Sequence, residues 1–263
     1  MQDQKLFGHR EGQVGHVVFN NPAKLNAVSL DMWERMVSIL ADFAQDPEIR
    51  CVVVSGTGGK AFVSGADISK FESERANAEA QVRYDAISKE GYESLYNFPK
   101  PTIAKINGYC IGGGMNLAAC CDLRYCNEAA RFGVPAAKLG LGYGFLRIER
   151  LSRIVGLPRA MEFLFTAKQY SSKEAAEMGL VHAVAATDAE LDAMVAKTAQ
   201  TIGENAPLTI ALAKASAREI AKPESQQNHA KLERMAVECF DSEDYKEGRR
   251  AFMEKRKPTF KGR

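Results

Sequence analysis

Three consecutive glycines stand between an apolar segment and a helix-like segment. Gly112-Gly113-Gly114 comes after the apolar residues 101–106 and directly before 115–121. That order predicts a strand, a tight turn and a helix N-terminus, where backbone N–H groups have no helical partner and the dipole favours negative charge. Glycine lets a ligand approach such N–H groups closely. The site suits an anionic transition state, such as the enolate of a thioester. The alternative is a turn that simply needs glycine.

A second glycine-containing segment lies at 61–68. It reads Ala-Phe-Val-Ser-Gly-Ala-Asp-Ile and follows the apolar stretch 51–55 and a glycine-rich turn. Two short motifs flank the glycine run, Asn-Gly-Tyr at 107–109 and Cys-Asp at 121–122. With these motifs in this order, the chain resembles the crotonase (enoyl-CoA hydratase/isomerase) superfamily. The resemblance covers nearly the full length, through the segments 21–27, 132–135, 175–181 and 247–252.

The resemblance implies a site built from backbone N–H groups. In this superfamily two such groups bind the thioester oxygen, and they correspond here to Ala66 and Gly113. Each donor lowers the barrier to an enolate by roughly 3–4 kcal/mol, judged from the loss of one oxyanion-hole donor in other enzymes. CoA is then part of the substrate, and no separate cofactor is expected. The residues expected to hold it are Ala23, Lys24, Leu25, Ser64, Ala66, Asp67 and Ile68.

Charged residues near these motifs allow two interpretations. Lys24 either adds charge beside the CoA phosphates or is a solvated loop lysine. The Lys-Arg-Lys stretch 255–257 either contacts a phosphate, across a subunit boundary, or forms a solvated tail. Asp67 and Asp122 adjoin the motifs, and we interpret both carboxylates as hydrogen-bond acceptors that stabilise turns.

Two positions depart from the hydratase pattern. Hydratases of the superfamily carry one glutamate two residues beyond the glycine run and another after the proline of Phe-Gly-x-Pro, where this chain has Asn116 and Ala136. An amide can orient water but cannot take a proton near neutral pH, and alanine can do neither. Each lost group is expected to cost about 10²–10⁴-fold in hydration rate. Asn116 remains a candidate contact to the acyl group or its water; the alternative is an uncharged filler that caps a turn.

Polar residues soon after Ala136 are candidates for relocated proton chemistry. Lys138, Arg147 and Glu149 lie here, and the glycine-rich loop 140–145 can turn a side chain inward. Tyr143 lies near the place where ring-forming and C–C bond-cleaving relatives put a polar catalytic group. A phenol can donate a hydrogen bond to an enolate, and it can protonate carbon if its pKa is lowered. The alternative is a tyrosine that lines an acyl pocket or packs at the surface.

Strand-like and helix-like segments alternate in the first half of the chain. Residues 13–19 and 50–55 are short, apolar and β-branched, as buried strands are. Residues 30–43 have helical apolar spacing, with Ser29 or Asp31 as a candidate cap, and 78–96 reads as a more polar helix. This alternation predicts an α/β fold.

After about residue 145 the pattern becomes mainly helical. Ser171 and Glu174 have the spacing of a capping box, and a short strand is expected at 180–184. Helices are expected at 188–203, 207–221 and 225–239, and the charged tail 243–256 carries an apolar stripe that needs a partner. The superfamily resemblance implies a spiral of ββα repeats over residues 1–200 and a helical C-terminal region, 201–263, that assembles trimers, often paired into hexamers.

Composition and charge exclude several classes of function. The formal net charge of +2 gives no case for nucleic acid, and no stretch approaches the roughly 18 apolar residues of a membrane span. The N-terminus shows no signal or transit pattern, so the cytoplasm is the expected location. The six cysteines form no CxxC pair, and the four histidines are not spaced with them as in a zinc site. We expect buried free thiols, structural histidines at 16, 182 and 229, and a metal-free site.

These observations predict an acyl-CoA enzyme of the hydratase/isomerase type that uses an oxyanion hole. Because both glutamates are replaced, decarboxylation, C–C hydrolysis or isomerisation stays open as the alternative chemistry. A different class of function, a non-catalytic acyl-CoA-binding protein, also stays open. Turnover of any CoA thioester in a panel would separate an enzyme from a binder.

Overall fold

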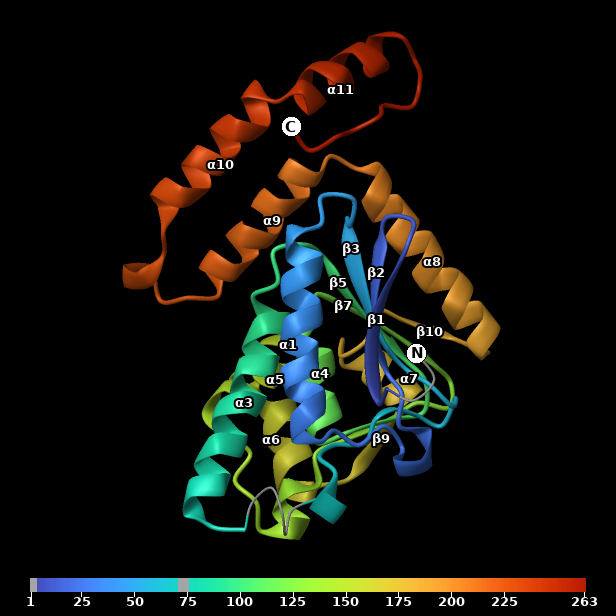
Figure 1. Cartoon of the computed structure of the whole chain (residues 1–263), viewed down its shortest axis with the longest axis vertical. Coiled ribbons are helices and arrows are strands. Elements are labelled where there is room, and N and C mark those ends of the chain that lie inside the picture. Colours follow the sequence, from blue (N-terminus) through green and yellow to red (C-terminus); the bar gives the residue numbers. More distant parts are fainter. Residues whose placement is uncertain (1–3, 71–75) are drawn as a thin grey trace.

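Two β-sheets surrounded by helices form the body of the molecule (Figure 1). The computed structural model describes residues 4–70 and 76–263. The larger sheet has the order β1-β2-β3-β5-β7-β10, and the smaller has the order β4-β6-β8-β9. The first contains β1 (Leu6–Glu11), β2 (Val14–Phe19), β3 (Cys51–Gly56), β5 (Thr102–Ile106), β7 (Leu123–Asn127) and β10 (Ala183–Ala185). The second contains β4 (Ala61–Val63), β6 (Tyr109–Ile111), β8 (Arg131–Gly133) and β9 (Gln169–Ser171).

Strand–strand–helix units build both sheets at once. β3, β4 and α3 (Ala78–Tyr96) form one unit, and β5, β6 and α4 (Gly113–Cys120) form the next. β7 and β8, followed by α5 (Phe145–Val155), form a third. The first strand of each unit joins the larger sheet and the second joins the smaller, with parallel pairing between successive units. This repetition winds the chain into a spiral of ββα units.

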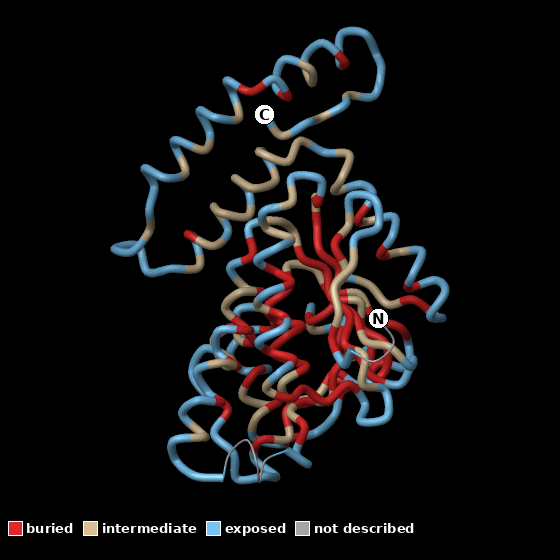
Figure 2. The backbone as a smooth tube through the Cα atoms, in the orientation of Figure 1, coloured by how far each residue is buried: buried red, intermediate tan, exposed pale blue. Residues whose placement is uncertain are grey.

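The core lies between the larger sheet and the helices on its flank (Figure 2). β3 is buried through Cys51–Ser55, which explains its continuous apolar, β-branched sequence, as in a strand covered on both faces. α1 (Leu30–Gln45) buries a stripe at helical spacing, made of Met32, Trp33, Met36, Ile39 and Leu40. α6 (Leu157–Thr166) and α7 (Ser172–Glu177) complete this part, and α8 (Asp188–Glu204) packs a second cluster against the other side of β3 and β5.

The C-terminal helices form an arm beyond the end of the larger sheet (Figure 1). The arm consists of α9 (Pro207–Ile220), α10 (His229–Asp241) and α11 (Glu243–Met253). Few of its residues are buried (Figure 2). Lys214 and Arg218 of α9 donate to the carboxylate of Asp122 at 2.7 and 2.9 Å, which ties the arm to the core. Within the described residues, no helix is both long and apolar enough to cross a membrane.

Several expected boundaries shift for local reasons. The capping box is confirmed, since Ser171 and Glu174 bond reciprocally at the start of α7. The expected strand 180–184 is instead β10, because Leu180 closes the α7 C-terminus by donating to Ala175 O. The helix expected from 225 begins at His229, where the Asn228 side chain accepts from Lys231 N. Ser29 precedes α1 without a side-chain cap bond, because its hydroxyl donates to Asp31 instead.

Candidate functional site

The glycine run forms a sharp turn whose last two residues open α4. Gly112 has φ +56°, a conformation that favours glycine, and its N–H donates to Gly133 O at 2.8 Å. Gly113 is the first residue of α4, so the helix supplies no carbonyl for its N–H. A Cβ on Gly114 would lie 2.0 Å from Val63 O. Packing against β4 therefore requires glycine at 114, and within the described residues the Gly113 N–H has no backbone acceptor.

The second segment leaves the N–H of Ala66 without a backbone acceptor. Val28 N donates to Gly65 O at 2.8 Å, and Asp67 N donates to Val28 O at 2.9 Å. In extended backbone successive N–H groups point to opposite sides, so the Ala66 N–H points away from Val28. Gly65 has φ +113°, which again favours glycine. The bridge between Val28 and Ala66 thus requires an extended backbone at Ala66, directly after Gly65.

The tertiary structure brings these two segments into contact. A Cβ placed on Gly65 would lie 3.7 Å from Gly113 N, and one placed on Gly113 would lie 3.5 Å from Gly65 Cα. Both segments line a cavity of about 150 Å³. Its described lining contains no aspartate or glutamate. The lining residues are Trp33, Ser64, Gly65, Ala66, Ile68, Tyr84, Ser88, Tyr92, Ile111, Gly112, Gly113, Val134, Pro135, Ala136, Leu139, Leu141, Tyr143 and Arg147.

Two buried tyrosines hold the carbonyl side of the glycine turn. Tyr143 donates its hydroxyl hydrogen to Gly112 O at 3.0 Å, and Tyr92 donates to Gly113 O at 3.2 Å. Burial raises the pKa of both phenols; the charge of Arg147 opposes that rise at each. Both hydroxyls therefore stay protonated near neutral pH. Tyr143 is identified from the sequence as a candidate site residue, whereas Tyr92 is missed. The feature of Tyr92 that could have been recognised is its position on the buried face of the 78–96 helix, with Tyr84 and Ser88.

Asn116 and Ala136, which stand in place of the glutamates, lie at the site. Asn116 is 1% exposed, one turn beyond Gly113 on α4, and its side-chain oxygen and nitrogen form no hydrogen bond with the residues that the structure describes. It lines a second cavity, of about 430 Å³, beside the first. Its amide lies close enough to Tyr92 to affect that phenol's pKa, but without the geometry of a hydrogen bond. Ala136 is buried and contributes only a methyl group to the first cavity.

The two segments predicted to hold CoA lie side by side. Ser64 N donates to Leu25 O at 3.1 Å, and Ser64 Oγ donates to Lys24 O at 3.4 Å. Ala23, Lys24 and Leu25 form an exposed turn, and Ile68, 63% exposed, lines the mouth of the first cavity. Of the predicted residues, Ser64, Ala66 and Ile68 line the first cavity, the exposed turn 23–25 lies beside them, and Asp67 is buried.

Lys24 is held by Asp67 rather than free in solvent. Its ammonium donates to the Asp67 carboxylate at 2.8 Å and to Ser69 Oγ at 2.5 Å. Burial by itself would raise the pKa of Asp67, but bonds from Lys24 and Ser69 and the charge of Lys24 outweigh it, so the pKa falls. Asp67 also accepts from Ser69 N, consistent with its predicted role in a turn. The lysine ammonium is thereby held beside Asp67 and Ser69.

The remaining candidates lie away from the two cavities. Arg256 is bound to Glu247 and Lys257 to Glu204, so the C-terminal basic stretch is engaged within the chain. His182 Nδ1 accepts from Arg124 N at 3.1 Å in a structural contact. His9, Glu11 and His16 lie together on the β1–β2 hairpin with ligand atoms within 4.8 Å, and none lines either cavity.

The cysteines are free and mostly buried, as expected. Cys51, Cys110, Cys120, Cys121 and Cys126 are buried, whereas Cys239 is partly exposed. Burial raises the pKa of Cys51, Cys120 and Cys126 to about 12. These thiols stay protonated and unreactive near neutral pH.

The chain is similar to known proteins over nearly its whole length. A family model described as "Enoyl-CoA hydratase/isomerase" matches residues 9–263. The short-chain-enoyl-CoA hydratase of Clostridium acetobutylicum is 35% identical over 257 residues, covering 98% of this chain and 97% of that protein. The peroxisomal Delta(3,5)-Delta(2,4)-dienoyl-CoA isomerase of Arabidopsis thaliana is 33% identical over 260 residues, covering 95% and 93%.

Solved structures agree with the fold. An enoyl-CoA hydratase/carnitine racemase from Magnetospirillum magneticum superposes with a TM-score of 0.94 at 35% identity, covering 99% of this chain and 96% of that one. An enoyl-CoA hydratase from Bacillus anthracis superposes with a TM-score of 0.91 at 31% identity, covering 99% of this chain and 100% of that one.

Proposed function

Because the chain belongs to the enoyl-CoA hydratase/isomerase family, we propose that it is an enzyme that acts on an acyl-CoA thioester. The observation that carries this proposal is the meeting of two unpartnered backbone N–H groups, from Ala66 and Gly113, at one cavity. Two such donors favour an enolate over the neutral thioester, since they strengthen as negative charge develops on the oxygen. The exposed turn 23–25 and the segment 64–68 are the proposed contacts for CoA.

We do not expect this enzyme to hydrate enoyl-CoA efficiently. The described lining of the first cavity offers no carboxylate, and Asn116 and Ala136 cannot take up a proton from water near neutral pH. Tyr92 and Tyr143 do not replace them, because their hydroxyl hydrogens are bound to carbonyl oxygens and burial raises their pKa values. Reactions that depend chiefly on the enolate, such as isomerisation, decarboxylation or C–C cleavage, suit this site better.

Two measurements test the proposal. Calorimetry should show that acetoacetyl-CoA, which mimics an enolate, binds more tightly than free CoA. Crotonyl-CoA should be hydrated with a kcat below the usual enzyme range of about 1–10³ s⁻¹. Equal affinity for acetoacetyl-CoA and CoA would contradict an oxyanion hole, and a kcat within that range would contradict the loss of hydratase chemistry.

Restoring the carboxylates tests the reason for slow hydration. Asn116→Glu combined with Ala136→Glu should raise the crotonyl-CoA hydration rate by an order of magnitude or more, in line with typical general acid–base contributions. Ala129→Glu, at an exposed position, is the matched control for an added charge. If thioesters bind but no member of an enoyl-, β-keto- and malonyl-type panel is turned over, the chain is a binding protein instead.

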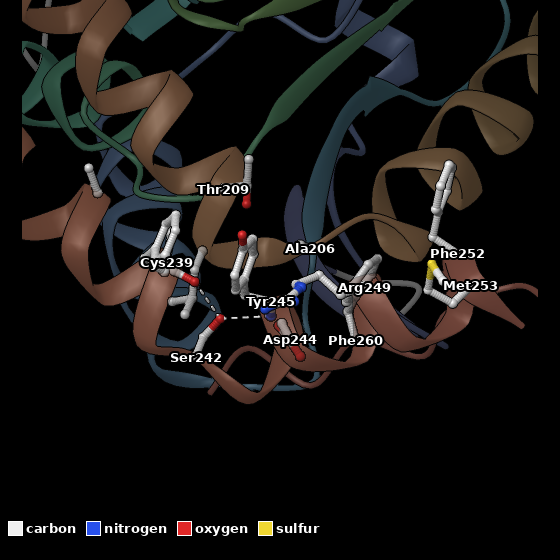
Figure 3. Close-up of a pocket in the computed structure, with 14 residues that line it drawn as sticks. Ala206, Thr209, Cys239, Ser242, Asp244, Tyr245, Arg249, Phe252, Met253 and Phe260 are labelled. Atoms are coloured by element: carbon white, nitrogen blue, oxygen red, sulfur yellow. Dashed lines mark hydrogen bonds between the residues drawn. The ribbon is translucent and has the colours of Figure 1, made fainter.

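We also propose that the C-terminal arm joins copies of this chain into a trimer or a pair of trimers. A cavity of about 720 Å³ lies along the arm (Figure 3). Tyr245, Phe252, Met253 and Phe260 line it. Phe252 and Met253 are 83% and 80% exposed. Large exposed apolar side chains grouped in this way mark an interaction surface, and a second copy of the chain supplies the matching surface.

A further inference from the structure

The second cavity continues the first. They share four lining residues: Tyr92, Leu141, Tyr143 and Arg147. The first cavity holds the two free N–H groups, while the second, of about 430 Å³, extends between α3 and the start of α5. A thioester whose oxygen meets Ala66 and Gly113 can therefore direct its acyl chain past the shared residues into the second cavity. The groups that line that cavity then select the acyl chain.

Arg147 is a half-buried cation at the junction of the two cavities. Its guanidinium carbon lies 5.3 Å from the centroid of the Tyr92 ring and 5.7 Å from that of Tyr143. No carboxylate in residues 4–70 or 76–263 lies within 4.0 Å of it. The other two arginines of the same helix are paired, Arg150 with Glu93 and Arg153 with Glu149. The two rings orient the guanidinium while its N–H groups remain available to a ligand.

Asn116 adds an unsatisfied amide to the same cavity. It is 1% exposed, and neither its carbonyl oxygen nor its NH₂ group has a hydrogen-bond partner within the described chain. A buried polar group in that state is unfavourable, so native proteins usually give it a hydrogen-bond partner. A purely hydrocarbon acyl chain would leave this amide unsatisfied, whereas a polar acyl terminus would not.

The charges of the second cavity leave a positive excess. Among the described residues, three cations line it, Lys89, Arg147 and Arg150, against two carboxylates, Asp85 and Glu93. Glu93 is occupied by Arg150, and Asp85 accepts from Gln81 Nε2 at 2.9 Å. Lys89 is exposed at the rim. The described lining therefore favours an anion, and within it Arg147 is a half-buried donor without a carboxylate partner.

We propose that the second cavity is a carboxylate subsite, in which Arg147 and Asn116 bind an acidic group at the far end of the acyl chain. The substrate class is then a CoA thioester of a dicarboxylic acid. This inference rests on the proposed acyl-CoA function and adds the chemistry of the acyl group to it. Arginine suits the role because its planar fork matches a carboxylate, and charge-assisted hydrogen bonds are about twice as strong as neutral ones.

The test compares acyl groups of equal carbon number with and without the carboxylate. Malonyl-CoA is paired with propionyl-CoA, and glutaryl-CoA with valeryl-CoA, in calorimetric binding at neutral pH. At least one carboxylated member should bind about tenfold or more tightly than its neutral partner, with a preference that weakens as salt rises. Arg147→Gln should reduce that preference to about twofold or less while retaining binding of the neutral thioester. Arg147→Lys should retain only part of it, because lysine lacks the fork.

Control variants distinguish a failure of the carboxylate subsite from a failure of the proposed acyl-CoA function. Arg153→Gln, on the same helix but outside both cavities, should leave the preference unchanged, and circular dichroism checks the fold of each variant. Lys89→Gln should change it less than Arg147→Gln does. If neutral and carboxylated thioesters bind equally in both pairs, or if Arg147→Gln keeps the preference, the subsite is refuted while the acyl-CoA function stands. If no thioester binds, the proposed function fails and the subsite fails with it.

Discussion

Gly113 combines an available N–H with close packing against the Tyr92 hydroxyl. A Cβ at this position would lie 2.9 Å from the Tyr92 hydroxyl oxygen and 3.5 Å from Gly65 Cα. A substitution at Gly113 therefore changes packing as well as hydrogen bonding. The Tyr92→Phe background removes the closest of these contacts, so the two effects can be separated there.

We expect Tyr92→Phe/Gly113→Pro to lose about 10²–10³-fold in turnover relative to Tyr92→Phe, because proline deletes one oxyanion donor. Proline is tolerated at the first position of a helix, although the positive φ of Gly112 makes circular dichroism necessary. Tyr92→Phe/Gly113→Ala keeps the N–H and is the control. Equal losses in the two double variants would show that packing, not the donor, is responsible.

Tyr143 is placed to support the turn rather than to transfer a proton. Its hydroxyl hydrogen is engaged with Gly112 O, and burial raises its pKa, with the nearby Tyr92 adding to the rise and Arg147 opposing it. A phenol with a raised pKa stays protonated from pH 6 to 9. The proposed oxyanion hole at Ala66 and Gly113 then remains as the proposed catalytic device.

Tyr143→Phe should therefore lower the stability by about 0.5–1.5 kcal/mol, the usual net contribution of one hydrogen bond. The kcat should fall by less than tenfold, and the shape of the pH–rate profile should not change. Chemical denaturation and steady-state kinetics measure the two effects. A tenfold or greater drop in kcat together with the loss of a limb of the pH profile would instead assign Tyr143 to proton transfer.

At the scale of elements, one carboxylate binds both cations that link α9 to the core. Asp122 accepts from Thr102 N and Oγ1 at 2.8 and 2.9 Å and from Lys214 and Arg218 of α9. Burial lowers the pKa of Lys214, and the charge of Asp122 opposes that effect. Without Asp122, two largely buried cations would face each other unpaired.

Asp122→Asn should destabilise the protein by about 2–3 kcal/mol at neutral pH, less than for a fully buried pair because Asp122 is 24% exposed. This corresponds to a fall in Tm of about 4–12 °C. A lysine whose folded pKa is lowered binds fewer protons folded than unfolded, so the loss should shrink as pH rises toward the unfolded value of about 10.4. The control is Asp192→Asn, which breaks an exposed pair with Lys105 and should cost at most about 1 kcal/mol. A similar loss in both variants, independent of pH, would contradict this assignment.

At the scale of the whole molecule, the C-terminal arm exposes apolar side chains that the single chain does not cover. Phe240 and Val237 on α10 are 66% and 59% exposed, in addition to Phe252 and Met253 on α11. Figure 2 shows the same contrast, with the arm mostly exposed beside a buried core. The predicted need of the 243–256 tail for a partner thus extends to α10.

Phe252→Asp combined with Met253→Asp should shift the protein from trimer or hexamer to monomer, because two charges cannot be desolvated at an apolar interface without partners. Light scattering coupled to size-exclusion chromatography measures the mass of each species. Val82→Asp, at a 69% exposed position on α3, is the control. A wild-type chain that is monomeric at micromolar concentration, or an assembly that survives the double variant, would contradict the proposed role of the arm.

Local requirements made much of this protein predictable from its sequence. Gly112 and Gly65 need positive φ, and the capping box at Ser171 depends on residues three apart, so short motifs specify them. The order of such motifs along the chain predicted the superfamily, and the alternation of strand-like and helix-like segments predicted the α/β fold; both predictions are confirmed. The spiral of ββα units came from that resemblance, since no repeat is visible in the residues themselves.

The tertiary structure decided which distant residues meet. Tyr92 reaches Gly113 across 21 positions, Tyr143 reaches Gly112 across 31, and Arg218 reaches Asp122 across 96. No local pattern encodes these contacts, because they depend on the register in which successive ββα units stack. The absence of a carboxylate beside Arg147 in the described chain is likewise a property of the assembled site. Glu149, two residues away in sequence, is bound to Arg153 on the next turn of the helix.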